Sequence, residues 1–279
     1  MSALILVFLS SLFHEVSVSI GKRQVANHTE SLYGMGFLGA IWATLFFIGI
    51  AVFSSADLIF LPESIPTFGL RAIFEIILLF VILHAIKDAD RSTLTSLRVL
   101  TIPLLLLVDI VLGYTLSGMQ IIGVTLLMAS AAVILFKAPA RSSKGKIMAL
   151  TSAVLAVVTI SLYKYDISNF NSVEAEQGLM YFILLVALII GSIVQGHENV
   201  FKYLLRPLCL FQSLASAAAA VLHSFAYVFM PASIILALSR SSEVFMSMIS
   251  GRMYFHETGL AARVCAFLLI VAGITLCVV

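Results

Sequence analysis

Long apolar stretches separated by short polar ones run the whole length of the chain. They fall near residues 2–20, 33–53, 68–86, 93–112, 118–136, 146–163, 178–195, 206–227, 232–252 and 260–278. Each is close to the length of about 20 residues that an apolar helix needs to cross a bilayer core. Backbone polar groups in hydrocarbon must be paired within their own segment, so the stretches are expected to be helices. The pattern therefore predicts an all-α integral membrane protein with ten transmembrane helices.

The connections between these stretches are short and hold most of the charged residues. Examples are residues 21–31, 87–91 and 137–146, and the longest connection is expected at Tyr165–Gln177. None of them is long enough for a soluble domain, so the chain is expected to be embedded along its whole length.

Composition agrees with this pattern and excludes some partners. Hydrophobic residues make up 61% of the chain and charged residues only 11%, whereas soluble domains carry about 25% charged residues. The net charge of +2 is small, and no basic run is interleaved with aromatic residues, as nucleic-acid binding would need. We expect a multi-pass protein of the cell membrane, with the lipid bilayer as a partner and no nucleic acid.

An internal repeat appears when the chain is compared with itself at an offset of 142 residues. The matched pairs are Ser10 and Ser152, Ser19 and Ser161, Lys22 and Lys164, Gly36 and Gly178, Gly49 and Gly191, and Arg98 and Arg240. A chance alignment is the alternative. Because five helices is an odd number, a second copy must enter the membrane from the opposite side. The sequence thus predicts two inverted five-helix repeats, 1–136 and 146–279, an arrangement typical of carriers with a central site.

Three stretches of the chain resemble a known family. Residues 231–276 contain a small-residue run, then Glu257 at a turn and Gly273 late in the next helix, and residues 112–135 and 1–26 are similar to other parts of the same pattern. The chain resembles EamA-type carriers of the drug/metabolite transporter superfamily. The resemblance implies two EamA-like repeats and transport of a small solute. The chain departs from the family pattern at Tyr114, where the family usually has Glu, and at Glu243, where Pro is common.

Orientation is predicted differently by charge and by resemblance. The connections after the first, third, fifth, seventh and ninth helices hold most of the Lys and Arg residues. The positive-inside rule then puts both termini outside the cell. The family resemblance implies that both termini are cytoplasmic, so both orientations stay open at this point.

The first apolar stretch carries an unusual polar face. Ser10, His14, Ser17 and Gly21 recur at helical spacing, and Glu15 adjoins them. Such a face cannot point at lipid, so we expect it to line a cavity. Glu15 could bind a cationic group or a coupling proton, and His14 could titrate near neutral pH. The alternative is a buried network that only ties this helix to its neighbours.

Two further pairs of ionisable residues lie inside apolar stretches. Arg240 and Glu243 share one helix face, and an arginine there could hold the carboxylate or phosphate of an anionic solute; a self-neutralising ion pair is the alternative. Arg71 and Glu75 are spaced i, i+4. Arg71, near a helix start, is expected to reach the lipid headgroups, while Glu75 is deeper and stays a site candidate. Ionisable residues inside a membrane are costly and so are functional candidates.

The leading hypothesis is a secondary transporter that moves a small polar metabolite by alternating access. Its driving force would be the solute's own gradient or protons. Our predicted substrate-binding residues are Glu15, His14, Arg240, Glu243 and Glu75. The sequence makes no prediction of oligomeric state.

Two alternatives were weighed. An intramembrane enzyme acting on a lipid-linked substrate could draw on Asp109, His223, Arg252 and His256, although no spacing unites them. A non-transporting assembly or sensor protein would want a large loop or tail for partners, and the chain has none. No zinc-protease helix, P-loop, dinucleotide fingerprint or Cys/His cluster is present. We therefore expect no enzymatic activity, no catalytic residues, no metal and no cofactor.

Overall fold

The computed structural model describes residues 2–53, 58–111, 117–137, 142–194, 196, 198–226 and 232–278, and it is helical throughout this part of the chain. Its α-helices are α1 (Ser2–Ala26), α2 (Leu32–Phe53), α3 (Ile65–Asp88), α4 (Arg91–Arg98), α5 (Thr101–Val111), α6 (Gly118–Phe136), α7 (Ser143–Asn169), α8 (Val173–Val194), α9 (Pro207–Ala226), α10 (Ala232–Tyr254) and α11 (Leu260–Val278). Two short 3-10 helices are η1 (Pro62–Ser64) and η2 (Val200–Leu205). The all-α prediction is confirmed.

Many of these helices have the length and apolarity of membrane spans. Within the described residues, seven stretches meet both requirements, and α9 and α11 contain shorter apolar segments. Helix α10 is long but carries Arg240, Glu243 and Arg252. The protein is therefore membrane-embedded, and the prediction of ten spans stays a prediction.

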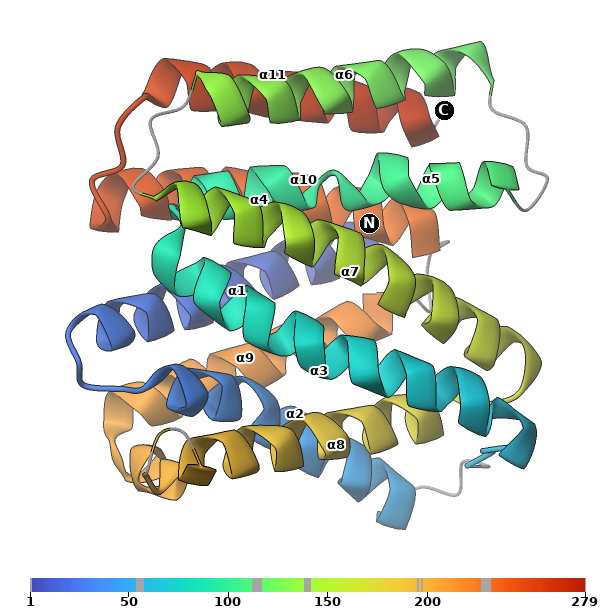
Figure 1. The fold of residues 1–279 in the computed structure, drawn as a ribbon, viewed down its shortest axis with the longest axis vertical. Coiled ribbons are helices and arrows are strands. Elements are labelled where there is room, and N and C mark those ends of the chain that lie inside the picture. Colours follow the sequence, from blue (N-terminus) through green and yellow to red (C-terminus); the bar gives the residue numbers. More distant parts are fainter. Residues whose placement is uncertain are drawn as a thin grey trace.

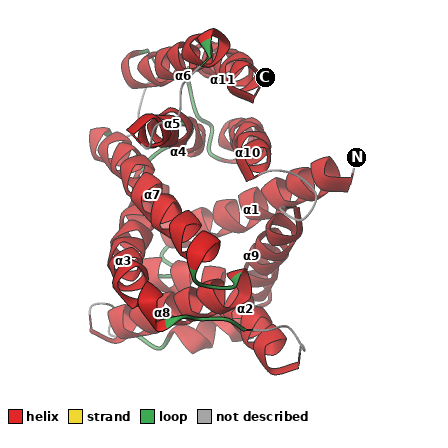
Figure 2. Ribbon diagram, turned by 90° about the vertical axis from the view of Figure 1, so that its right-hand side faces the viewer, coloured by secondary structure: helices red, strands yellow, loops and turns green. Residues whose placement is uncertain are grey.

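The helices form a stack of levels that lie roughly parallel to one another (Figure 1). Helices α6 and α11 form one outer level, and α4, α5 and α10 lie beneath them. Helices α1, α3, α7 and α9 fill the middle, and α2 and α8 form the opposite outer level, an order that the rotated view repeats (Figure 2). Direct packing of α6 on α11, of α1 on α9 and of α2 on α8 agrees with this order.

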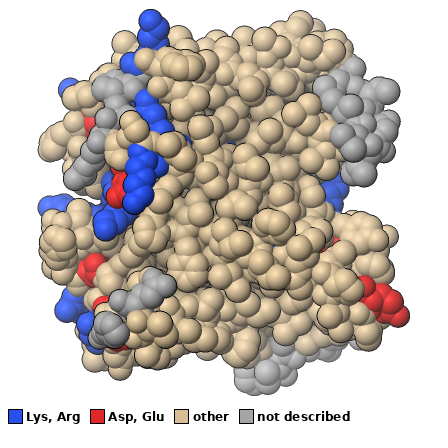
Figure 3. Space-filling model, in the orientation of Figure 1, with Lys and Arg blue, Asp and Glu red and all other residues tan. Residues whose placement is uncertain are grey.

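The connections gather on two opposite sides of the stack, where the helices begin and end; we call these sides its two ends. We call the end that holds residues 27–31, 89–90, 198–206 and 255–259 the basic end. Its Lys and Arg residues include Lys22, Arg23, Lys87, Lys144, Lys146, Lys202, Arg206, Arg252 and Arg263. On the face seen in Figure 3, most blue side chains gather along this margin, and an uncharged band separates them from the opposite end.

Apolar cores hold the levels together. Phe37 and Leu38 of α2 pack with Leu188 of α8 and with Tyr203 of η2. A second core joins α3, α4, α6, α7 and α11, and a third lies between α6, α10 and α11. The side chains between these cores are the polar ones described below.

Two predicted connections are shorter in the structure than the sequence suggested. Helix α1 continues to Ala26, with Lys22 buried in it and bonded to the carbonyl of Ala89. Helix α7 runs to Asn169 and α8 starts at Val173, so the long connection expected at Tyr165–Gln177 was wrong. Polar residues there contact other parts of the chain: Asp166, for example, accepts from the Thr67 hydroxyl at 2.5 Å through Oδ1.

The span predicted at 93–112 is a helix with a break rather than one continuous helix. Helix α4 ends at Arg98 and α5 begins at Thr101. Pro103 has no N–H to donate to the Val99 carbonyl, so that carbonyl accepts instead from Ile102 at 3.0 Å. The Thr101 hydroxyl donates a hydrogen bond to the Arg98 carbonyl. This stretch of backbone therefore departs from the regular i to i−4 hydrogen-bond pattern.

Candidate functional site

Glu15 joins three helices in the interior of the stack. Arg91, at the start of α4, donates to it through Nη2 at 2.7 Å and through Nε at 3.2 Å. Ser19 donates to Glu15 Oε1 at 2.9 Å, and the Ser250 hydroxyl of α10 also donates to it. Glu15 and Arg91 are both buried. The predicted alternative, a network that ties the first helix to its neighbours, is therefore part of what Glu15 does.

Arg240 and Glu243 form an ion pair on the inward face of α10. Arg240 Nη1 lies 2.8 Å from Glu243 Oε2. Arg240 is 7% exposed, and its Nε is buried with no hydrogen-bond partner among the described residues. His14 of α1 and His223 of α9 both interact electrostatically with Glu243. His223 also contacts the Ser239 hydroxyl at 3.2 Å.

Arg98, the last residue of α4, is a site residue that the sequence analysis used only as a repeat match. Its Nε is buried without a partner, and it forms no ion pair with any carboxylate whose side chain is described. Its strongest electrostatic neighbour is Arg240, followed by Glu243, Arg91 and Glu75. The signal that could have found it was the match of Arg98 to Arg240 in the repeat.

Together these residues form what we call the central cluster, which consists of His14, Glu15, Arg91, Arg98, His223, Arg240 and Glu243. Four of the five predicted substrate-binding residues, all but Glu75, belong to it. The cluster brings together α1, α4, α9 and α10. His14 and Glu15 lie in the candidate span Ile5–Ala26 and Arg98 lies in the candidate span Arg91–Val108, where an ionisable group needs a partner or a function.

Glu75 and Arg71 lie beside the central cluster on α3. Arg71 is buried and its Nη1 is 2.6 Å from Glu176 of α8, so the expectation that it reaches lipid headgroups was wrong. The ring of Tyr163 lies under its guanidinium at 4.5 Å, and Glu75 is 3.9 Å away. Carboxylates brought by another helix hold Arg71 inside, which sequence spacing within α3 could not show.

A second charged network closes the basic end. Glu257, in the turn before α11, accepts from the backbone N–H of Arg91 at 2.5 Å and from the Ser92 hydroxyl at 2.5 Å. Arg263 lies 2.5 Å from Glu257 and 3.0 Å from Asp90. The Glu257 carboxylate thus caps the amino end of α4, where unpaired N–H groups and the helix dipole favour negative charge.

We call these five residues, Asp90, Arg91, Ser92, Glu257 and Arg263, the basic-end seal. Gly251 lets Glu257 approach, because a Cβ there would stand 2.5 Å from its Oε2. Gly145 at the start of α7 likewise abuts the backbone of Ala89. The seal therefore joins α4, α10 and α11 at one end of the stack, with α7 packed close behind.

Glu30, also at the basic end, is a buried carboxyl that the sequence placed in a loop. Burial raises its pKa to about 8. Gln212 donates to one of its oxygens at 3.1 Å, while its other oxygen and the Gln212 carbonyl oxygen are buried without a donor among the described residues. A proton held on Glu30 would supply a donor that this contact otherwise lacks.

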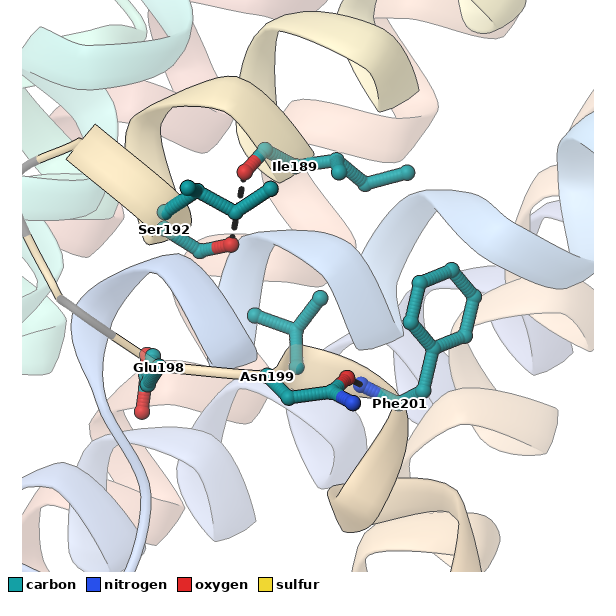
Figure 4. A pocket seen from close by; sticks show the side chains of 7 residues that line it. Ile189, Ser192, Glu198, Asn199 and Phe201 are labelled. Atoms are coloured by element: carbon teal, nitrogen blue, oxygen red, sulfur yellow. Dashed lines mark hydrogen bonds between the residues drawn. The ribbon is translucent and has the colours of Figure 1, made fainter.

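One cavity lies away from the central cluster. It measures about 520 Å³ and is lined by Ile189, Ser192, Ile193, Glu198, Asn199, Val200 and Phe201 (Figure 4). Ser192 donates to the Ile189 carbonyl at 2.7 Å, and Asn199 accepts from the Phe201 N–H at 2.9 Å. Its polar groups are therefore already engaged, and we do not assign it as the site.

A second cavity lies between α1 and α10. It measures about 380 Å³ and is lined by Ile5, Val7, Phe8 and Leu9 of α1 and by Leu238 and Ser242 of α10. None of the central-cluster residues lines it. It lies toward the end of the stack opposite the seal.

The residues of the enzyme alternative are not brought together. His223 belongs to the central cluster, whereas Arg252 and His256 are exposed at the basic end. The side chain of Asp109, like the whole of Tyr114, lies outside the described residues. No group of His, Cys, Asp and Glu side chains suited to a metal ion occurs in the described part of the chain.

Comparison with known proteins adds no identity. The chain matches no protein-family model, and no curated protein is significantly similar to it. The central cluster is the candidate site because of its geometry and burial.

Proposed function

We propose that this protein is a secondary carrier that moves a small polar metabolite across the membrane by alternating access. The central cluster would hold the solute. The observation that carries the proposal is a group of interacting charged and titratable side chains from α1, α4, α9 and α10, of which Glu15, Arg91 and Arg240 are buried. Desolvating such charges costs about 2.5–3.5 kcal/mol per residue on insertion scales, so a cluster of them favours a solute site.

The helix packing supports two inverted repeats. Helix α1 packs on α9 and α10, and α7 packs on α3, α4 and α5. Exchanging each helix with its counterpart one repeat away turns the first set of contacts into the second. The same exchange returns the pairs α2 with α8 and α6 with α11 to themselves. A two-fold relation between halves requires this pattern, and inverted repeats place substrate sites between the halves.

Repeat-related residues support the same relation. Gly36 of α2 faces Leu188 of α8, and its counterpart Gly178 of α8 faces Phe47 of α2. Arg98 and Arg240, another matched pair, interact with each other electrostatically in the central cluster. The EamA resemblance of residues 231–276 is consistent with a carrier of this architecture.

The basic-end seal supports alternating access. It ties α4, α10 and α11 together at one end, while the 380 Å³ cavity opens between α1 and α10 toward the other end. In such a carrier, opening of the seal would expose the cluster at the basic end. The concentration of Lys and Arg there favours a cytoplasmic basic end, because such residues accumulate in cytoplasmic loops.

The test is transport by purified protein in lipid vesicles. Vesicles loaded with a defined mixture of small metabolites should lose one class of solute only when the protein is present. Glu15→Gln or Arg240→Ala should abolish this loss while the protein still inserts, and Arg252→Ala, on the exposed end of α10, should not. Full transport by both cluster variants would remove the site assignment. Product formation without a sealed vesicle would favour an enzyme instead.

A further inference from the structure

We propose that the transported solute carries a carboxylate or phosphate group, and that Arg98 and Arg240 hold this group between them. This inference rests on the proposed carrier function and names the chemical class of its solute. It is argued from the charges that the central cluster leaves unmatched.

Arg98 is the unmatched charge of the cluster. Glu15 is bonded to Arg91 at 2.7 Å, and Glu243 is bonded to Arg240 at 2.8 Å. Each carboxylate of the cluster therefore already has a cation. Glu75, the next carboxylate on the neighbouring helix α3, lies 3.9 Å from Arg71. Arg98 is left without an ion pair among the described side chains, a costly state for a cation deep in a protein.

Both arginines also keep a free donor. The Nε of Arg98 and the Nε of Arg240 are each buried, and neither has a hydrogen-bond partner in the part of the chain that the structure describes. A guanidinium offers its donors in a planar fork that fits the two oxygens of a carboxylate or phosphate. Because Glu243 bonds only to Nη1 of Arg240, the Nε edge of that residue remains available for a second anion.

The two guanidinium groups interact with each other, so one anion between them would contact both. Among the charged residues, Arg240 has the largest electrostatic influence on Arg98. Their repulsion destabilises the cluster as it stands. A bound anion between them would replace repulsion with two charge-assisted contacts.

Their place in the chain connects binding to movement. Arg98 ends α4 in the first half, and Arg240 occupies the matching position of α10 in the second half. An anion bridging them would bind the two halves at once. It would therefore stabilise arrangements that bring the arginines together over those that separate them, which is what a solute must do to shift a carrier between states.

A lipid headgroup offers the same phosphate chemistry, so the test must separate the two sources. A water-soluble solute fits the cluster better than a headgroup, because Arg240 is only 7% exposed. An anionic headgroup would have to leave the bilayer surface and enter the interior of the stack.

The first experiment is thermal unfolding of the purified full chain in a neutral detergent. Inorganic phosphate, succinate and glucose 6-phosphate are titrated against sodium chloride of equal ionic strength. At least one of them should raise the melting temperature, since a ligand that binds the folded state stabilises it. Arg98→Gln and Arg240→Gln should each weaken this apparent affinity by about tenfold or more. Arg98→Lys should retain part of it, because it keeps the charge and loses the fork.

Arg252→Gln is the matched control, since this arginine lies on the same helix as Arg240 and is exposed. It should respond to the anions as the unaltered protein does. Monodisperse elution of each variant checks that it is folded. Stabilisation by none of the three anions would overturn the proposal, and so would unchanged stabilisation in both glutamine variants. Stabilisation only by phosphatidic acid in lipid nanodiscs, and by no soluble anion, would make it a headgroup site and overturn it as well.

The second experiment separates this inference from the carrier function. Vesicles are loaded with succinate, glucose 6-phosphate, choline and glucose, and the loss of each is followed by mass spectrometry. Loss of an anion that disappears with Arg98→Gln supports both proposals. Loss of choline or glucose alone would keep the carrier and refute the anionic solute. Anion-dependent stabilisation without loss of any solute would keep the anion site and refute the carrier.

Discussion

The basic-end seal and the central cluster, which share Arg91, are both groups of charged residues in the interior of the protein, but they differ in how completely their charges are matched. In the seal, Glu257 receives Arg263, the Ser92 hydroxyl and the backbone N–H of Arg91, and Arg263 also reaches Asp90. In the central cluster, Arg98 has no ion pair among the described side chains and Arg240 keeps a buried free Nε. A charge network that only stabilises a fold can be completed within the protein. A charge network that binds a solute must keep some charges or hydrogen-bond donors unpaired for that solute.

The largest expected effect comes from breaking the seal. Glu257→Gln removes the charge that neutralises Arg263 and caps α4. Loss of one partner from a buried ion pair typically destabilises by about 3–5 kcal/mol. Thermal unfolding in detergent should show a melting temperature lowered by several degrees. Glu63→Gln, at an exposed position of η1, is the control and should melt like the unaltered protein. A Glu257→Gln protein of unchanged stability would mean that the seal does not hold the basic end.

A second expected effect depends on pH, because Glu30 is an incompletely matched carboxyl within the basic end. Its pKa of about 8 lies above the ordinary value of 4.5. Below about 4.5 the group is protonated in both the folded and unfolded states. As the pH rises toward 8, only the unfolded state releases the proton, so the free energy of unfolding should fall over this interval.

The measurement is the melting temperature at a series of pH values for the unaltered protein and for Glu30→Gln. The glutamine variant should lose this part of the decline, because it cannot ionise. Nearby Glu198 and Arg206 also act on Glu30, so both proteins must be compared at equal salt concentration. Identical pH dependence of the two proteins would contradict a proton held on Glu30 in the folded state.

A smaller effect is expected from adding one methyl group beside the seal. In Gly251→Ala, the new Cβ would stand 2.5 Å from Glu257 Oε2, so the carboxylate must shift away from its partners. Such crowding in a packed interior typically costs about 1–3 kcal/mol. Gly49→Ala in α2 is the matched control, because nothing lies within 4 Å of the added atom. It should be neutral or slightly stabilising, and equal behaviour of the two variants would refute the close approach of Glu257.

The smallest effect on stability is expected at Arg98, and it bears most directly on the difference between the central cluster and the basic-end seal. Arg98→Gln removes a half-buried charge that has no ion pair among the described side chains, so stability should stay within about 1 kcal/mol of the unaltered protein or rise. Arg91→Gln, on the same helix, leaves Glu15 without its cation and should cost several times more. Thermal unfolding of the pair checks this. A severe loss of stability in Arg98→Gln would place Arg98 among the structural charges.

The sequence was sufficient for features that depend on local pattern. Apolar stretches near the length of a span predicted the helices, and helical spacing predicted that Glu15, Arg240 and Glu243 face inward. It was insufficient where a partner comes from far along the chain. Arg71 is held inside by Glu176, 105 residues away, and Arg91 meets Glu15 across 76 residues. No periodicity within one helix indicates such contacts.

Two misjudged features had signals in the sequence. Pro103 inside the fourth apolar stretch indicated the break between α4 and α5, since proline removes one helical hydrogen bond. The match of Arg98 to Arg240 indicated a symmetric pair of cations at equivalent depths. The extended connection expected at Tyr165–Gln177 failed for another reason: polar residues there have partners across the interface between α3, α7 and α8.

The break at residues 99–100 divides one span into two helical segments, α4 and α5, which are held by different contacts. Helix α4 is held by Glu257 at its first residue, Arg91, and ends at Arg98, next to the break. Pro103 of α5 donates no hydrogen bond to the Val99 carbonyl. Turning α5 against α4 would therefore not have to break that hydrogen bond. Loss of the contact between Glu257 and α4 would thus act, through about two turns of helix, on the guanidinium of Arg98. In the proposed carrier, α4 and α5 would turn about this break, Glu257 of the turn before α11 would release α4, and Arg98 would respond to the solute.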